Sequence, residues 1–250
     1  MIDYTLNHTK AEKLYYIGHS MGTTVSYILL SMKPEYNKKM HLVVSLSPVA
    51  FWNRGISPQL SYLLAHYPVI KRILDTHGIY DIAPQSEVYA LVGKTFCNSN
   101  APTQPVCSSL LFLLSGYDPV QFNATLFPYI FRYYPCGTST QVFGHFYQNA
   151  MSGNFQMYDY GYYTNMRRYK QRNPPLYDLK NISAPIVMFY GLNDAVVQPD
   201  NVMELAEYLP NVAAVEPVPY RLFTHVDFLW SNDKKELLYD RLMQIMEQSN

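Results

Sequence analysis

A serine between two glycines stands near the start of the chain, in the run Gly18-His19-Ser20-Met21-Gly22. Gly-x-Ser-x-Gly is the pattern of a nucleophile elbow, in which small neighbours let a strand and a helix approach while a strained serine exposes its hydroxyl. The expected context is present, because residues 13–17 form a short β-prone run and residues 23–32 continue as a helix. We therefore predict that Ser20 is a nucleophile; the alternative is a glycine-rich helix start.

A serine hydroxyl is a weak nucleophile at neutral pH, so it needs a histidine base and a carboxylate that orients the imidazole. In this kind of site the chain order is serine, acid, histidine. Asp194 follows an apolar run at residues 185–190, and His225 follows the next apolar run at residues 213–218. We predict that these two residues complete a triad with Ser20, and that the backbone N–H of Met21 stabilises the oxyanion.

Two other acids compete with Asp194. Asp200 stands at a probable helix start, where a carboxylate can cap exposed backbone N–H groups. Asp227 is only two residues from His225, so it reaches a local backbone group more easily than the far nitrogen of the imidazole. Asp194 remains the preferred acid.

The elements around these residues predict an α/β fold. The runs at residues 13–17 and 41–46 flank one helix, which makes a βαβ unit and implies a parallel sheet with a right-handed crossover. Residues 201–208 and 234–247 are expected to be helical, the latter with apolar side chains on one side. The alternation is lost between about 51 and 177. We therefore predict core segments at residues 1–50 and 178–250, separated by a cap or lid insertion at residues 51–177.

Composition excludes several classes of protein. In 250 residues, 48% are hydrophobic, and 19 basic residues balance 19 acidic ones. A globular protein is expected, without an overall field that would attract nucleic acid. No apolar run approaches the roughly 18 residues that a transmembrane helix needs.

Cysteines and sequons indicate a secretory protein. Cys97 and Cys107 close a short loop in a polar stretch and are predicted to form a disulfide that leaves Cys136 unpaired. Three reduced thiols are the alternative. Asn-x-Ser/Thr sequons, which are candidate glycosylation sites, start at Asn7, Asn123 and Asn181. The first residues lack the pattern of a signal peptide, which conflicts with these two features.

Taken together, these residues resemble the acid lipase family, which includes gastric lipase, lysosomal acid lipase and insect relatives. The resemblance covers nearly the whole chain and is carried by Gly18-His19-Ser20-Met21-Gly22-Thr23-Thr24, Ser47-Pro48-Val49-Ala50, Gly116-Tyr117-Asp118, Gly137-Thr138-Ser139, Gly153-Asn154-Phe155-Gln156-Met157-Tyr158-Asp159-Tyr160, Pro174-Pro175-Leu176-Tyr177, Gly191-Leu192-Asn193-Asp194 and His225-Val226-Asp227-Phe228-Leu229-Trp230.

The resemblance implies an α/β-hydrolase fold and a lipase that cleaves triacylglycerols or steryl esters at a lipid interface, without a cofactor or metal. It also implies a helical cap with one disulfide, matching Cys97 and Cys107, and a secreted or lysosomal location. Met21 stands where the family usually has Gln, a change that a backbone donor tolerates.

The family's signal peptide, first strands and a His-Gly-Leu loop with a second oxyanion donor have no counterpart before Ser20. The sequence is therefore expected to be N-terminally truncated. The alternative function is a catalytically impaired lipid-binding or yolk-type protein. An esterase for small soluble esters is disfavoured by the large apolar insertion.

Overall fold

Four parallel strands form the central sheet of the computed structural model, which describes residues 1–249. Their order is β1 (Leu14–His19), β2 (Met40–Leu46), β5 (Ile186–Tyr190) and β6 (Val212–Pro217). The two central strands, β2 and β5, are mostly apolar and almost completely buried, as expected for parallel strands covered on both faces. Their register pairs Val44 with Val187 and Leu46 with Phe189.

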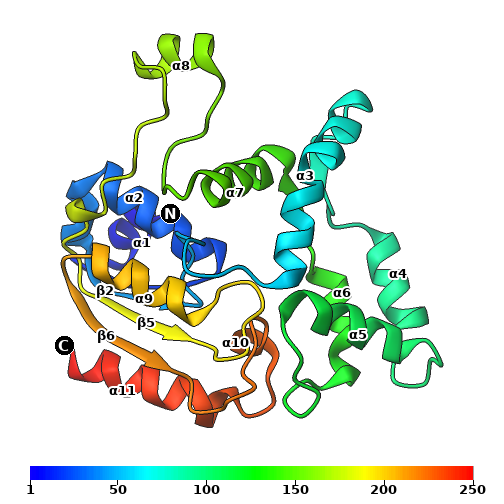
Figure 1. Cartoon of the computed structure of the whole chain (residues 1–250). Coiled ribbons are helices and arrows are strands. Elements are labelled where there is room, and N and C mark those ends of the chain that lie inside the picture. The colour runs from blue at the N-terminus through cyan, green and yellow to red at the C-terminus, as the bar shows by residue number, and fades with distance from the viewer. Residues whose placement is uncertain (250) are drawn as a thin grey trace.

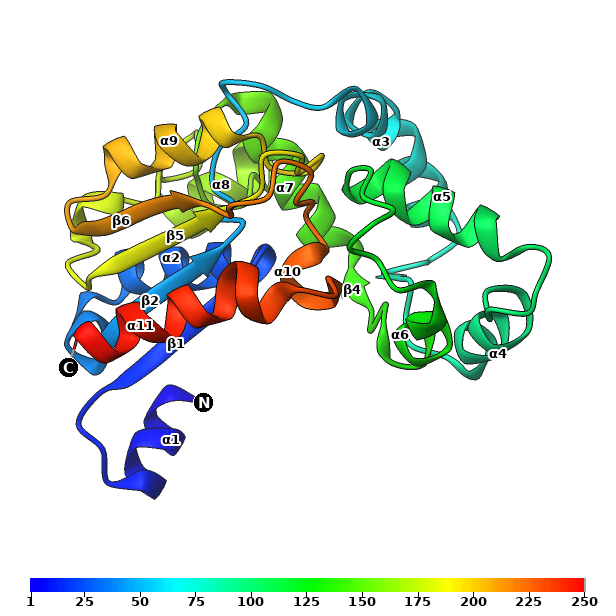
Figure 2. The ribbon, with the colours of Figure 1, turned by 90° about the horizontal axis from the view of Figure 1, so that it is seen from below.

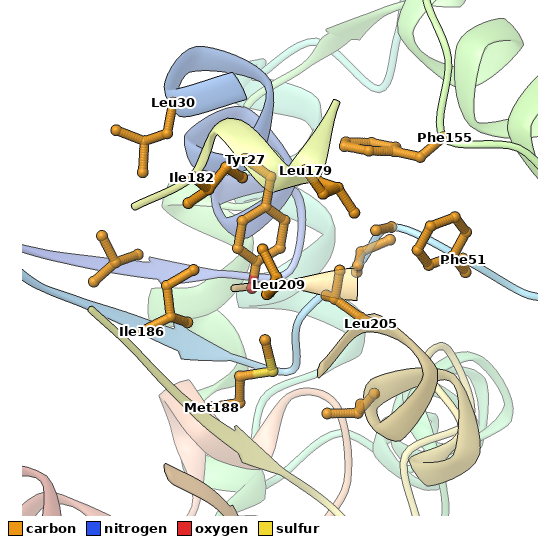
Figure 3. Close-up of a cluster of buried hydrophobic side chains, with 14 of the residues drawn as sticks. Tyr27, Leu30, Phe51, Phe155, Leu179, Ile182, Ile186, Met188, Leu205 and Leu209 are labelled. Atoms are coloured by element: carbon orange, nitrogen blue, oxygen red, sulfur yellow. The ribbon is translucent and has the colours of Figure 1, made fainter. Parts of the chain in front are cut away.

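One face of the sheet is covered by α2 (Met21–Met32) and α9 (Pro199–Tyr208), as Figure 1 shows. The largest apolar cluster lies there, and Figure 3 shows Tyr27 of α2 and Leu205 of α9 close to the strand residues Ile186 and Met188. Phe51 and Phe155 extend this cluster, so segments near both ends of the region 51–177 pack into the main core.

The other face is covered by the C-terminal segment. It comprises α10 (Asp227–Trp230), the π-helical segment Lys235–Tyr239 and α11 (Asp240–Gln248). Leu238 and Leu242 pack there with Phe228 against Val187. The amphipathic helix that the sequence predicts at residues 234–247 is therefore present, with a π-helical first part.

Residues between β2 and β5 form mainly helices. They are α3 (Pro58–Thr76), α4 (Glu87–Phe96), α5 (Gln104–Ser115), α6 (Phe127–Tyr133), α7 (Thr140–Ser152) and α8 (Tyr162–Tyr169), with a small antiparallel pair of β3 (Asp81–Ile82) and β4 (Thr138–Ser139). Helices α3 to α6 gather beyond the carboxyl ends of the sheet strands (Figure 2), whereas α8 projects from the body (Figure 1). The boundaries of a separate cap at 51 and 177 stay a prediction.

A helix that the sequence pattern does not predict, α1 (Ile2–Thr9), precedes β1, and only its Leu6 is buried. Among residues 1–249, no helix is both long and apolar enough to cross a membrane.

Candidate active site

The carboxyl end of β1 carries the elbow. Ser20 has φ +52° and ψ −119°, a conformation that L-residues rarely adopt, and it stands at the N-terminus of α2. Gly18 is required by close approach, because a Cβ atom there would lie 2.9 Å from the carbonyl carbon of Gly22. A Cβ at Gly22 would meet only the Tyr16 hydroxyl, at 3.8 Å. Of the two elbow glycines, therefore, only Gly18 is sterically indispensable.

His225 connects the serine to an acid. Its Nε2 atom lies 2.8 Å from Ser20 Oγ, and its Nδ1 atom lies 2.8 Å from Asp194 Oδ2. Because an ionised carboxylate only accepts hydrogen bonds, Nδ1 carries the proton and Nε2 is free to accept one from the serine hydroxyl. The imidazole thus has the tautomer that a general base for Ser20 needs.

Asp194 lies in the turn after β5 and is almost completely buried. Its Oδ1 atom accepts hydrogen bonds from the backbone N–H groups of Val196 and Val197, at 2.8 and 2.9 Å. Burial opposes the charged form, but His225, the Ser47 hydroxyl and the Val197 N–H together hold the carboxyl pKa below its ordinary value. The carboxylate is therefore ionised beside the imidazole.

Ser47, whose role the sequence pattern does not predict, follows β2 directly and is fully buried. Its Oγ atom donates to Asp194 Oδ2 at 2.6 Å and lies 2.9 Å from His225 Nδ1. Its φ of +49° is also unusual for a non-glycine residue. The one available signal was its position in Ser47-Pro48, at the carboxyl end of a buried strand.

His19 is a second histidine at the site. Its ring centre lies 4.8 Å from that of His225, and its Nε2 atom lies 2.8 Å from the His225 backbone oxygen. Burial, and secondarily the neighbouring His225, lowers the pKa of His19 to about 4. His19 is therefore neutral near pH 7, so no second positive charge lies against the imidazole.

A cavity of about 380 Å³ opens beside the serine, within the range of ~300–1,000 Å³ that is usual for ligand sites. Its lining is largely apolar and comes from the elbow, the first turns of α3, the segment before α7 and α7 itself, including Met21, Leu60, Leu63, Tyr134, Cys136, Phe143 and Phe146. The Met21 N–H belongs to the first turn of α2, where backbone donors have no partner within the helix. The described residues include no group of three or more side chains suited to hold a metal ion.

The two rival acids lie apart from the imidazole nitrogens. Asp200 is exposed in the first turn of α9. Asp227 is buried and accepts a hydrogen bond from the Thr224 N–H at 2.7 Å, the local backbone contact that its spacing suggested.

The remaining predicted residues lie outside this network. Cys97, at the end of α4, forms a disulfide with Cys107 on α5, and the free Cys136 is exposed. Asn7 is exposed on α1, and Asn123 accepts hydrogen bonds from Thr125. Asn181 is exposed, and its side-chain amide donates to the Ser31 carbonyl. Glycosylation at these three positions stays a prediction.

Comparison with known proteins finds lipases among the proteins that this chain is similar to. Residues 1–66 match the model of the alpha/beta hydrolase fold family. Over 250 residues the chain is 33% identical to Lipase 3 of Drosophila melanogaster, an alignment that covers 99% of this chain and 63% of that protein. It is also 33% identical to gastric triacylglycerol lipase of Mus musculus, covering 98% of this chain and 61% of that protein. The chain thus spans about three fifths of the length of these curated relatives.

Solved structures match the fold at lower identity. A soluble variant of monoglyceride lipase from Saccharomyces cerevisiae matches with a TM-score of 0.55 and 15% identity, covering 100% of this chain and 67% of that one. The putative non-heme bromoperoxidase BpoC from Mycobacterium tuberculosis matches with a TM-score of 0.51 and 14% identity, covering 99% and 72%. At this identity the likeness concerns the fold alone.

Proposed function

Because this chain belongs to the acid lipase family within the α/β-hydrolase superfamily, we propose that it is a serine ester hydrolase for fatty-acyl esters such as triacylglycerols or steryl esters. The observation that carries the proposal is the position of His225, which lies 2.8 Å from both the Ser20 hydroxyl and the Asp194 carboxylate. A non-catalytic lipid-binding protein has no need for a histidine held between a strained serine and a buried acid.

The reaction follows from these contacts. As the Ser20 oxygen attacks the ester carbonyl, its proton passes to His225 Nε2, and Asp194 stabilises the resulting imidazolium through Nδ1–H. The Met21 N–H donates to the oxyanion. The imidazolium then gives its proton to the departing alcohol, which leaves an acyl-serine. Water, deprotonated by His225, attacks that acyl-serine and releases the fatty acid together with the free Ser20 hydroxyl.

The surroundings of the site favour a lipid substrate. The apolar cavity beside Ser20 suits an acyl chain. On α5, Val106, Leu110, Leu113 and Leu114 are each more than half exposed. Their spacing of four, seven and eight residues from Val106 places them on one side of the helix. We propose that this apolar stripe of α5 contacts the lipid surface from which the substrate is taken.

A secreted or lysosomal location is part of the proposal. The Cys97–Cys107 disulfide supports it, because disulfides persist in oxidising compartments and are rare in the cytosol.

Hydrolysis of two esters by the purified protein tests the proposed function. We expect release of fatty acid from an emulsified triacylglycerol and from a soluble short-chain ester, and loss of both activities in Ser20→Ala. A variant carrying Leu110→Ser and Leu114→Ser should lose most activity on the emulsion, because its apolar stripe is interrupted, while it hydrolyses the soluble ester as before.

Met243→Ser provides a matched control, because Met243 is also about half exposed but lies on α11, on the sheet face opposite α2 and α9. It should leave both activities unchanged. Binding of the emulsion without release of fatty acid would contradict the proposal and would favour the lipid-binding alternative.

A further inference from the structure

Two buried carboxyl groups lie beside the site without taking part in the proposed reaction. Asp118 follows the end of α5 and has no measurable exposure, and Asp227 begins α10 with 1% exposure. The two side chains lie close enough together for the charge of Asp118 to raise the pKa of Asp227. A hydrogen bond between carboxyl groups requires a proton on one of them, because two carboxylates offer only acceptors.

The hydrogen-bond donors of the two carboxyl groups are backbone N–H groups and one tyrosine hydroxyl. Asp118 Oδ1 accepts from the backbone N–H groups of Val120 and Gln121, both at 3.1 Å, and from the Tyr220 hydroxyl at 3.3 Å. Asp118 Oδ2 is buried and has no hydrogen-bond donor among the described residues. Asp227 Oδ2 accepts from the Thr224 N–H at 2.7 Å.

No cation neutralises the pair within residues 1–249. Neither carboxyl group forms an ion pair there, and the nearby Lys234 ammonium donates to the Ser231 carbonyl. The other titratable groups around the pair are Tyr220, Asp233, which accepts from the Gln121 side chain, and His225. Burial, followed by the charge of Asp118, raises the pKa of Asp227 to about 6, although the Thr224 contact opposes the rise.

The pair joins two segments that hold the proposed triad. The Ser115 carbonyl at the end of α5 accepts from the His225 N–H at 3.1 Å and from the Ala195 N–H at 3.2 Å. Gly116, with φ +112°, is so close to the acid turn that a Cβ atom would lie 2.1 Å from the Asn193 oxygen. The end of α5 therefore contacts the loop of His225 and the turn of Asp194 together.

We propose that Asp118 and Asp227 share one proton and act as positioning residues, which fasten the His225 loop to the end of α5 until deprotonation makes them repel each other. This inference rests on the proposed function for its effect on turnover, but the sharing of the proton itself does not. Two carboxylates in such close contact cannot both ionise without a large cost.

Because folding raises the pKa of Asp227, the pair stabilises the folded protein at low pH. Folded Asp227 holds its proton up to about pH 6, whereas an unfolded Asp releases it near 3.8. Between these values the folded state binds more protons, so the contribution of the pair to stability is full below pH 3.8 and is lost as pH rises through 6.

The first test is the pH profile of kcat/KM on a soluble ester, measured for Asp118→Asn and Asp227→Asn. In each variant the amide retains an acceptor for the backbone N–H groups that the carboxyl group binds, and it removes one of the two charges. The alkaline limb of each variant should therefore move upward by about one pH unit or more. The double variant should move no further than the single ones, because each substitution removes the same repulsion. Asp233→Asn is the matched control and should keep the profile of the unaltered protein.

The second test needs neither activity nor a folded variant. Carbon-13 NMR of the Asp carboxyl groups in the unaltered protein should show one that titrates near pH 6. A carboxyl spectrum without such a group, or an alkaline limb that both single variants leave in place, overturns the proposal. If the unaltered protein hydrolyses no ester at any pH, the proposed function fails, while the NMR titration still decides whether the proton is shared.

Discussion

Ser47 Oγ lies 2.6 Å from Asp194 Oδ2, so the acid of the proposed triad is bound from the strand next to its own. Asp194 follows β5 and Ser47 follows β2, and the two strands are paired in parallel. Because the carboxyl ends of neighbouring parallel strands lie at the same edge of a sheet, Ser47 lies next to the Asp194 carboxylate. The backbone N–H groups of Val196 and Val197 occupy the other oxygen, so both carboxylate oxygens have donors.

Replacement of Ser47 should therefore lower the catalytic rate without abolishing activity. In Ser47→Ala the Asp194 carboxylate keeps its backbone donors but loses a hydrogen bond to a charged group, of the kind that contributes about 1.5–3 kcal/mol. We expect kcat to fall roughly tenfold, which corresponds to ~1.4 kcal/mol of transition-state stabilisation. Steady-state kinetics on a soluble ester measures this change.

Ser45→Ala is the matched control for that substitution. Ser45 is also fully buried on β2, but its Oγ atom accepts from the Tyr27 hydroxyl, away from the triad. It should lower stability and leave kcat unchanged. Equal losses of kcat in the two variants would show that Ser47 acts through the packing of β2 and not through Asp194.

Substitution of the three acids distinguishes the proposed one from its rivals. Asp194→Asn should lower turnover by around 10⁴-fold, the scale seen when a triad acid becomes an amide and the imidazole takes the wrong tautomer. Asp200→Asn and Asp227→Asn, assayed near pH 5, should retain turnover within about tenfold, because neither side chain contacts the imidazole nitrogens. Kinetics in which Asp227→Asn is the most damaging change would mean that Asp194 is the wrong acid.

The sequence predicts the sheet and the network Ser20, His225 and Asp194 because those features depend on local patterns. The two central strands are buried apolar runs and the two edge strands are short β-prone runs, so the sequence predicts all four to within about two residues of their observed bounds. The elbow is a local motif, and the chain order of the triad restricts the choice of acid and base.

Features that depend on packing between distant segments could not be predicted. Ser47 meets Asp194 across a separation of 147 positions, and the sequence near Ser47 shows only a strand end. The Asp118–Asp227 pair likewise joins the end of α5 to the start of α10. The individual helices of residues 51–177 were missed, because scattered proline, glycine and aromatic residues obscure the helical period there.

His19 should make stability depend on pH in the opposite direction to the Asp118–Asp227 pair. Its folded pKa is about 4 against 6.5 for an unfolded histidine, so the unfolded state binds more protons between these values. Stability is full above pH 6.5 and is lost as pH falls toward 4. The loss reaches at most about 3 kcal/mol, since one pKa unit corresponds to ~1.4 kcal/mol.

Urea unfolding of the unaltered protein and of His19→Gln at pH 7 and pH 4 measures this effect. Glutamine does not titrate and can still donate to the His225 carbonyl, so the variant should lose less stability on acidification. The same loss in both proteins would mean that His19 is not held neutral by the fold.

Labelling with a fluorophosphonate probe, followed by mapping of the modified peptide, tests most directly whether Ser20 is the nucleophile. The reagent reacts with an activated serine, and both Ser20 and Ser47 lie within 3 Å of a nitrogen of His225. Only Ser20 contacts Nε2, the nitrogen that can accept its proton. The adduct is predicted on Ser20, retained in Ser47→Ala and absent from Ser20→Ala; an adduct on Ser47, or labelling that survives Ser20→Ala, would contradict the assignment.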